Sequence, residues 1–344
     1  MSEHVTWLIP IKNGMPYLSE TLASIEAQTY KNWEVLVWDN GSTDGTIEEL
    51  EKWIPNRLPG RVIVGEPLTL GGSLARMVEI CETEFCARID ADDINLPERL
   101  EKQVEFLSNH PEIAVVGSQI DPIDEKGMSK EYSLPMPLNH DDIVHGMLSG
   151  HPISHPSVLF RRSSILQVGN YRDVANIEDY DLWLRVAQQY KIANLDGHLV
   201  KYRIHENSTT MLAIRENRLK KVMDDWICSN APLSFGCSES DMRLLREKSH
   251  LFAFRPILQI AKYLQQTQGG NLSDRLNSAS FINNAKHLIS SKDVISLLLL
   301  GVRHPDRLFI YREIKNILKS SLKKVPGLTK TFARYRNPNT SHKT

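Results

Sequence analysis

The chain has 344 residues, of which 41% are hydrophobic and 24% charged, as in a globular protein with about two buried cores and unlike a disordered or collagen-like chain. Its 41 basic residues against 42 acidic ones give a net charge of −1, which argues against binding nucleic acid over the whole surface. The charge is unevenly spread, because residues 303–344 hold 11 Lys and Arg against 2 Asp and Glu.

Short apolar runs alternate with amphipathic stretches over about the first two hundred residues. We predict buried strands at residues 5–11, 33–39, 61–64, 84–89 and 113–116. Helical spacing appears between them, as with Leu18, Leu22 and Ile25. This alternation predicts βαβ units and a mainly parallel sheet, whose functional groups gather at the carboxyl ends of the strands.

The pattern changes further along the chain. Loops rich in Gly and Pro are expected from Gly117 to His140, followed by a strand at 156–160, a helix at 179–189 and paired strands near 192–195 and 199–204. After about residue 211 we predict only helices, at 216–229, 240–266, 272–290, 292–300 and 305–324. The sequence therefore predicts an α/β domain at 1–215 and an all-helical region at 216–344.

Cysteine spacing and hydropathy bear on the cellular compartment. The four cysteines form no Cys-x-x-Cys pair and are too few for a disulfide framework, so we expect reduced thiols in the cytoplasm. The first residues show no basic, cleavable leader, and the longest apolar run, Val294–Val302, is about half of the ~20 residues that span a bilayer. A soluble protein, or one attached only to a membrane surface, is expected.

Carboxylates follow the predicted second and fourth strands. Asp39 ends the second strand, where it could accept hydrogen bonds from a ribose hydroxyl or a base N–H; the alternative is that residues 40–46 simply form a turn. After the fourth strand, the pattern Asp90-Ala-Asp-Asp93 presents hard oxygens that suit Mg²⁺ or Mn²⁺ on a diphosphate. The alternative there is a solvated acidic loop that caps the next helix.

Two later segments also carry candidate groups. Glu178, Asp179 and Asp181 open a predicted helix, where a carboxylate could serve as a general base or merely interact with the helix dipole. Near residue 205, His205 could ligate a metal or contact a phosphate, and Arg203 could bind a phosphate through two nitrogens; a structural role for both is the alternative.

These segments, in this order, resemble the inverting glycosyltransferase family 2, whose members have a GT-A fold. The resemblance covers about residues 4–210 and rests on six motifs: LIPIKN at 8–13, WDNGSTD at 38–44, RIDADD at 88–93 with LPERL at 96–100, HPSVLFR at 155–161, EDYDLW at 178–183 and YRIH at 202–205. Each motif is weak alone, but the ordered set is specific.

The resemblance implies a fold and a set of roles. The fold would be α/β, a GT-A (nucleotide-diphospho-sugar transferase) fold with a mainly parallel central sheet, followed by the C-terminal helical region. The residues implied to contact the nucleotide sugar, expected to be a UDP-sugar, are Pro10, Asp39, Asp90, Ala91 and Glu178. Asp179 matches the catalytic base, and Asp92 and His205 match the ligands of Mg²⁺ or Mn²⁺, with Asp93 as a helper.

The implied reaction is transfer of one sugar, of the hexosyltransferase type, to a hydroxyl of a glycan or lipid-linked acceptor in O-antigen, capsule or exopolysaccharide synthesis. The Gln-x-x-Arg-Trp motif of processive members is absent, which favours a single transfer. Met77 and Val78 stand where relatives often carry Asn and Gly. The alternatives are a nucleotidyltransferase of related architecture, which would have a Gly-rich basic loop after the first strand, and an inactive binding module, which would have lost Asp92 or Asp179.

The basic tail suggests a second kind of contact. In residues 305–324 the apolar side chains fall on one side of a predicted helix and the Lys and Arg side chains roughly opposite. This pattern is typical of a helix at an anionic membrane surface, and would place the protein at the inner face of the plasma membrane. The alternative is that the apolar side packs on the protein.

Overall fold

The computed structural model describes residues 3–130, 135–147, 150–174, 176–206, 208–215 and 218–246, together with residues 259, 260, 263, 266 and 267. The chain divides into two compact units, Met1–Ser234 and Phe235–Thr344. The first holds the whole sheet, and the described part of the second includes helix α10 (Glu239–Arg246). The helices expected at 272–290, 292–300 and 305–324 lie outside the described residues.

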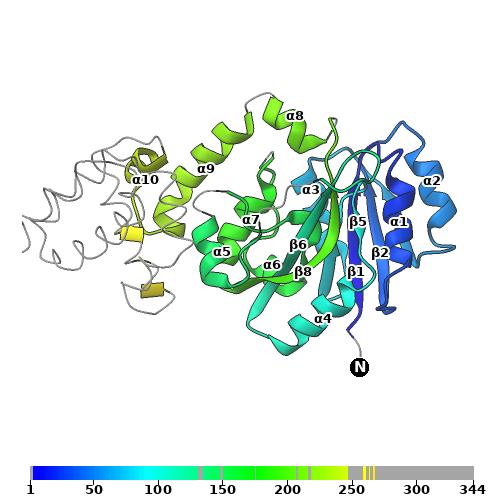
Figure 1. The fold of residues 1–344 in the computed structure, drawn as a ribbon, viewed down its shortest axis with the longest axis horizontal. Coiled ribbons are helices and arrows are strands. Elements are labelled where there is room, and N and C mark those ends of the chain that lie inside the picture. Colours follow the sequence, from blue (N-terminus) through cyan, green and yellow to red (C-terminus); the bar gives the residue numbers. More distant parts are fainter. Residues whose placement is uncertain are drawn as a thin grey trace, which may run out of the picture. The chain divides into compact units, whose positions relative to one another are not determined.

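An eight-stranded mixed sheet forms the centre of the first unit, in the order β3-β2-β1-β4-β7-β6-β8-β5 (Figure 1). The strands are β1 (Val5–Ile11), β2 (Trp33–Asp39), β3 (Gly60–Val64), β4 (Phe85–Arg88), β5 (Ile94–Asn95), β6 (Ile113–Ile123), β7 (Leu159–Arg161) and β8 (Lys191–Arg203). Parallel pairing joins β3, β2, β1 and β4, and also β6 and β8, whereas β7 and β5 pair antiparallel with their neighbours. The sheet is therefore mostly parallel, as the alternating pattern predicts.

Helices cover the sheet and connect its parallel strands. They are α1 (Leu18–Glu26), α2 (Thr46–Trp53), α3 (Leu70–Ile80), α4 (Arg99–Asn109), α5 (His140–Gly146), α6 (Arg162–Gln167), α7 (Glu178–Val186), α8 (Thr209–Arg215) and α9 (Arg218–Ser234), with a short 3-10 turn η1 (His155–Ser157). Helix α3 packs on β1 and β2 and also contacts α6 and α7. Figure 1 shows α1 and α2 beside β1 and β2, away from α5 and α7. None of the helices formed by the described residues is long and apolar enough to cross a bilayer.

The position of β1 in the sheet explains why its sequence is a continuous apolar run. All seven of its residues are buried, because β2 and β4 pair with its edges and helices cover its faces. A strand buried on both faces needs a continuous apolar run rather than an alternating one. The first four strands could thus be located from the sequence to within one residue at each end.

Two predictions about the second half of the sheet are wrong. Strand β6 does not end at residue 116 but continues to Ile123, where Gly-Pro-rich loops were expected. The two short strands expected at 192–195 and 199–204 are one strand, β8, which pairs with β6 across register shifts near Ser118 and Gln119. These irregularities interrupt the apolar pattern, because Ser118 and Gln119 are buried polar residues whose side chains hydrogen-bond backbone atoms.

A buried guanidinium ties α4 to the sheet. Arg99 is fully buried and donates to the carbonyl oxygens of Pro156 at 2.8 Å, Arg88 at 2.8 Å and Val158 at 3.1 Å. Its Cζ atom lies over the ring of Trp7, 5.0 Å from the ring centroid. Burial, together with the charge of Arg88, lowers the pKa of Arg99 to about 9, which leaves it protonated at neutral pH.

Removal of this guanidinium should destabilise the first unit strongly. We expect Arg99→Met to lower the free energy of unfolding by about 3 kcal/mol, because three carbonyl oxygens each lose a charged donor. Urea unfolding followed by tryptophan fluorescence measures this loss. Arg57→Met is the matched control, because Arg57 is an exposed arginine that pairs with Glu26 and lies over a tryptophan ring. Equal losses in the two variants would contradict the structural role of Arg99.

Candidate active site

The carboxyl ends of β1 and β2 form the first wall of the candidate site. Asp39 ends β2 opposite Ile11, the last residue of β1, and Pro10 lies buried one position earlier, opposite Trp38. Oδ2 of Asp39 accepts hydrogen bonds from the backbone N–H groups of Gly41 at 2.9 Å and Ser42 at 3.1 Å. Oδ1 is buried and has no partner among the described residues. An oriented carboxylate with one free oxygen is suited to accept a hydrogen bond from a ligand.

The loops after β1 and β2 are joined to one another. The backbone N–H of Asn13 donates to Ser42 Oγ at 2.8 Å, and Asn13 Oδ1 accepts from the N–H of Thr43 at 2.9 Å. Gly14 N donates to Thr46 Oγ1 at 2.8 Å. Asn13 has a φ of +56°, a left-handed conformation that asparagine tolerates better than most residues. The two loops therefore hold Asp39 in a cross-linked frame.

The acidic loop after β4 forms the second wall. Arg88, the last residue of β4, is buried, and its guanidinium pairs with both carboxylate oxygens of Asp90. The distance from Nη1 to Oδ2 is 2.7 Å. Burial raises the pKa of Asp90 to about 6; the charge of Arg88 opposes this rise and the charge of Asp92 adds to it. Ala91 stands between them, 3.4 Å from where a Cβ on Gly14 would lie, so this loop also approaches the loop after β1.

Asp93 is the most deeply placed of the three carboxylates. It is fully buried, and its Oδ1 accepts from the backbone N–H of Arg203 at 2.8 Å, while its Oδ2 has no partner among the described residues. Burial raises the pKa of Asp93 well above its usual range, and the charges of Asp92 and Asp90 add to the rise. The charge of Arg88 opposes this rise without cancelling it.

The acidic loop could hold a divalent cation. One oxygen from each of Asp90, Asp92 and Asp93 lies within 4.8 Å of the others. Mg²⁺ and Mn²⁺ prefer such hard oxygen ligands. A cation there would also use the unpartnered oxygen of Asp93 and offset the repulsion that raises these pKa values. The residues therefore fit a divalent metal.

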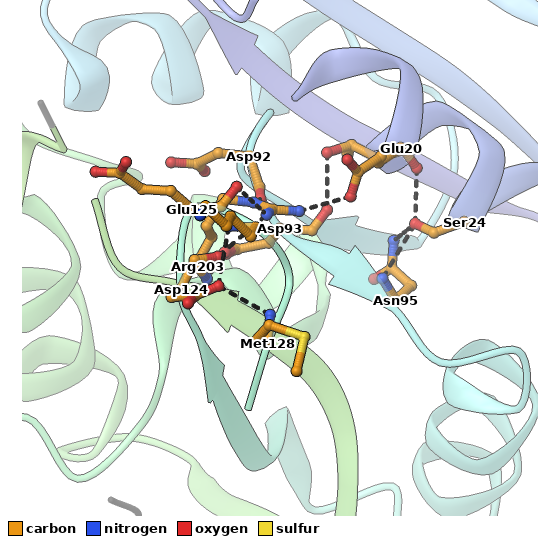
Figure 2. A network of polar contacts seen from close by, with 11 residues as sticks. Glu20, Ser24, Asp92, Asp93, Asn95, Asp124, Glu125, Met128 and Arg203 are labelled. Atoms are coloured by element: carbon orange, nitrogen blue, oxygen red, sulfur yellow. Dashed lines mark hydrogen bonds and ion pairs between the residues drawn. The ribbon is translucent and has the colours of Figure 1, made fainter. Parts of the chain in front are cut away.

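Figure 2 shows how Arg203, at the end of β8, fixes the acidic loop. Its Nε donates to the backbone oxygen of Asp92 at 2.8 Å, and its Nη2 pairs with Glu20 of α1 at 2.7 Å. Its Nη1 donates to the carbonyl oxygens of Asp124 and Glu125, both at 3.2 Å. Arg203 is 1% exposed, so its donors serve the protein interior. Of the two roles considered for Arg203, phosphate binding and a structural one, these contacts favour the structural role.

His205 reaches the acidic loop through its side chain. Its Nε2 lies 2.9 Å from Oδ2 of Asp92, and its ring lies 5.3 Å from that of Tyr17. The structure therefore brings together both residues predicted to bind metal. The contact between Asp92 and His205 is direct and uses Oδ2 of Asp92.

Helix α7 supplies the third wall, and its first three carboxylates have different environments. Asp181 is buried and pairs with Arg185, whose Nε and Nη2 lie 2.9 and 2.5 Å from its Oδ2, and with Arg172 at 3.6 Å. Asp181 is therefore structural. Glu178 and Asp179 instead converge with His155 of η1, one ligand atom of each lying within 4.8 Å of the others.

The charges of this second cluster are unequal. Burial would raise the pKa of Asp179, but the charge and hydrogen bond of His151 hold it below its usual range. Burial and the charge of Asp179 raise the pKa of Glu178 to about 7. Burial and the charge of Arg88 lower the pKa of His155, whose Nε2 lies 2.9 Å from Tyr171 Oη. At neutral pH Asp179 is ionised, whereas Glu178 is only partly ionised, a division typical of acid–base sites.

The two clusters adjoin. The charge of Asp179 raises the pKa of Asp90, and the charge of Asp90 raises that of Glu178. Close packing at the start of α3 supports this arrangement, because a Cβ on Gly71 would lie 2.4 Å from the backbone oxygen of Arg172 and 3.0 Å from Cβ of Glu178. Only glycine permits this approach.

Sequence reasoning did not single out Arg88 or His151. A signal for Arg88 existed, because a charged residue inside an apolar strand just before a carboxylate suggests a buried pair. No comparable signal marks His151, whose position depends on the fold of a segment without periodicity.

Comparisons with known proteins agree with this geometry. A family model described as "Glycosyl transferase family 2" matches residues 6–169. The amylovoran biosynthesis glycosyltransferase AmsE of Erwinia amylovora is 35% identical over 189 residues, 54% of this chain and 70% of that protein. The O-antigen biosynthesis glycosyltransferase WbnJ of Escherichia coli is 34% identical over 206 residues, 58% of this chain and 78% of that protein.

Solved structures agree on the fold. S. aureus TarS 1–349 in complex with UDP-GlcNAc has a TM-score of 0.58 at 18% identity and covers 92% of both chains. The mannosyltransferase PcManGT of Pyrobaculum calidifontis, in complex with GDP-Man and Mn²⁺, has a TM-score of 0.54 at 15% identity, covering 94% of this chain and 89% of that one. The predicted GT-A fold is confirmed. With relatives more than 30% identical over more than two thirds of their own length, the chain belongs to glycosyltransferase family 2.

Proposed function

We propose that the protein transfers one hexose from a nucleoside-diphosphate sugar to a hydroxyl of a glycan or lipid-linked acceptor. The proposed donor is a UDP-sugar, and the transfer inverts the configuration at the anomeric carbon. The strongest support is that two clusters lie next to one another: the acidic loop at 90–93, which can hold a cation, and the cluster of His155, Glu178 and Asp179, in which Asp179 is ionised. The curated relatives named for amylovoran and O-antigen synthesis support a role in cell-surface polysaccharide formation.

The donor nucleotide would bind at the ends of β1, β2 and β4. Asp39 offers its unpartnered Oδ1 to a base N–H or a ribose hydroxyl, and Pro10 lies beside it on β1. Asp90 and Ala91 line the acidic loop next to the proposed diphosphate position. Glu178, whose pKa is raised to about 7, is partly protonated near neutral pH, and its protonated form could donate a hydrogen bond to the donor sugar.

Asp92 and His205, with Asp93, would hold Mg²⁺ or Mn²⁺. A metal bound there would stabilise the charge that develops on the departing diphosphate. The acceptor hydroxyl attacks the anomeric carbon from the face opposite the diphosphate, and Asp179 accepts its proton. The bond between the anomeric carbon and the diphosphate oxygen breaks, and its electron pair leaves with the diphosphate. A single displacement of this kind inverts the anomeric configuration without a covalent enzyme intermediate.

The proposal extends to the cell. A cytoplasmic enzyme that meets lipid-linked acceptors would work at the inner face of the plasma membrane, and the basic tail at 305–324 would suit an anionic surface there. The division into a catalytic domain at 1–215 and a helical region at 216–344 belongs to the same proposal.

A donor panel tests the proposed function. The full-length protein is incubated with UDP-GlcNAc, UDP-glucose, UDP-galactose or GDP-mannose, with Mg²⁺, Mn²⁺ or EDTA, and release of nucleoside diphosphate is measured. We expect metal-dependent release from at least one donor, and NMR of the released sugar should show the inverted anomer first. Absence of both binding and hydrolysis across the panel would overturn the proposal, and a retained anomer would overturn the inverting step.

A further inference from the structure

A histidine outside the family motifs contacts the proposed catalytic base. His151 lies in the segment that leads into η1, and its Nδ1 is 3.5 Å from Oδ2 of Asp179. Its ring packs edge-on against Tyr180, with centroids 5.3 Å apart and an interplanar angle of 69°. The other oxygen of Asp179, Oδ1, accepts from the N–H of Tyr180 at 2.7 Å. Both carboxylate oxygens of Asp179 therefore have a partner supplied by the protein.

The surroundings of Asp179 make such a partner necessary. The carboxylate is nearly buried, and its immediate neighbour Glu178 competes with it for the ionised state. An ionised carboxylate in such a place is costly unless a cation is paired with it. His155 of η1 does not supply that charge at neutral pH, because burial and Arg88 keep it unprotonated. Arg88 itself is committed to Asp90.

His151 is the nearest group that can supply the charge. Its side chain is 32% exposed, so the imidazole can exchange protons with solvent. The groups that face it are Asp179 and Glu178, both of which raise the pKa of His151 against the lowering effect of burial. The neutral His155 and the ring of Tyr180 lie on the same side. The two acidic neighbours favour the imidazolium.

We propose that His151 is the positioning residue of the base: its imidazolium holds Oδ2 of Asp179 and keeps this carboxylate ionised beside Glu178. The inference rests on the proposed role of Asp179 in the transfer. When the acceptor oxygen bonds to the anomeric carbon, its proton moves to Asp179, and the electron pair of the broken bond leaves with the diphosphate. His151 does not touch the reacting atoms in this scheme, but it sets the pH range over which Asp179 can accept the proton.

A titration by NMR tests the pairing without any need for activity. Histidine ring signals of the ¹³C-labelled protein are followed against pH, and the signal missing from His151→Gln identifies His151. We expect His151 to titrate above its usual pKa of about 6.5 and to move downward in Asp179→Asn, which has no charge at this position. His198, which pairs with Asp121 at 2.7 Å on β6 and β8, is the matched control and should not move. An unchanged His151 titration in Asp179→Asn would overturn the pairing.

The pH profile of turnover tests its consequence. Removal of the imidazolium raises the pKa of Asp179. The base of the variant therefore becomes protonated, and inactive, at a higher pH than the base of the wild type. For His151→Gln we therefore expect the acid limb of nucleoside diphosphate release to move up by about one pH unit or more, with UDP affinity unchanged. His198→Gln should keep the wild-type profile. If the acid limb does not move in His151→Gln and Asp179→Asn is inactive, the inference about His151 is overturned and the base stands. If Asp179→Asn is active, the proposed base itself is overturned.

Discussion

Asp179→Asn is expected to slow sugar transfer by roughly 10²–10⁴-fold, the range typical for loss of a general base, while the protein still binds its donor. The amide keeps the shape of the side chain and can still contact His151, but it has no lone pair basic enough to take a hydroxyl proton. Asp179 is not among the residues proposed to bind the nucleotide sugar, and Asp39, which is, lies on another element at the end of β2, so donor binding should persist. Donor affinity is measured by calorimetry with UDP and the active UDP-sugar, and transfer by release of UDP.

The matched control comes from the same helix. Asp181 is also a buried carboxylate of the first turn of α7, but it pairs with Arg185 and Arg172 instead of joining the second cluster. We expect Asp181→Asn to lower the midpoint of thermal unfolding and to leave transfer by the folded protein within a few-fold of wild type. If Asp179→Asn transferred sugar at the wild-type rate, Asp179 would not be the base.

The framework of the site could be predicted from the sequence, because parallel strands bring their carboxyl ends together. Asp39 and the loop at 90–93 each follow a buried apolar run, and the structure places both at the same edge of the sheet. The distinction among the carboxylates of α7 could not be predicted in this way. Glu178, Asp179 and Asp181 are equivalent by helix-dipole reasoning. Asp181 differs through its i,i+4 pair with Arg185, and Glu178 and Asp179 differ from it through their tertiary contact with His155.

The remaining errors have one physical origin: pairing between segments far apart in the chain. β6 continues past residue 116 because β8 pairs with it to Ile123, and no periodicity within 117–123 signals that partner. Arg203 looks like a phosphate ligand in the sequence, yet the fold places Glu20 and the turn at 124–125 around its guanidinium. His151 acquires a role only because η1 and α7 meet.

Asp92→Ala is expected to remove the response of the enzyme to Mg²⁺ and Mn²⁺ and to lower donor turnover by about 10²-fold or more. Asp92 lies between the two other carboxylates of the acidic loop and also contacts His205, so its loss removes a proposed ligand and frees the imidazole at once. Binding of Mn²⁺ measured by electron paramagnetic resonance, with and without UDP, separates loss of the metal from loss of the fold.

The control for Asp92→Ala is a carboxylate that also contacts a histidine but lies outside the site. Asp121 on β6 pairs with His198 on β8 and is half-exposed. Asp121→Ala should bind Mn²⁺ and turn over donor like the wild type. If Asp92→Ala retained activation by metal, Asp92 would not be a metal ligand, and the activating cation would have to bind through other residues. Because Asp93 is buried with an unpartnered oxygen and a strongly raised pKa, we expect the loop to need a cation, so metal binding and turnover should fall together in Asp92→Ala.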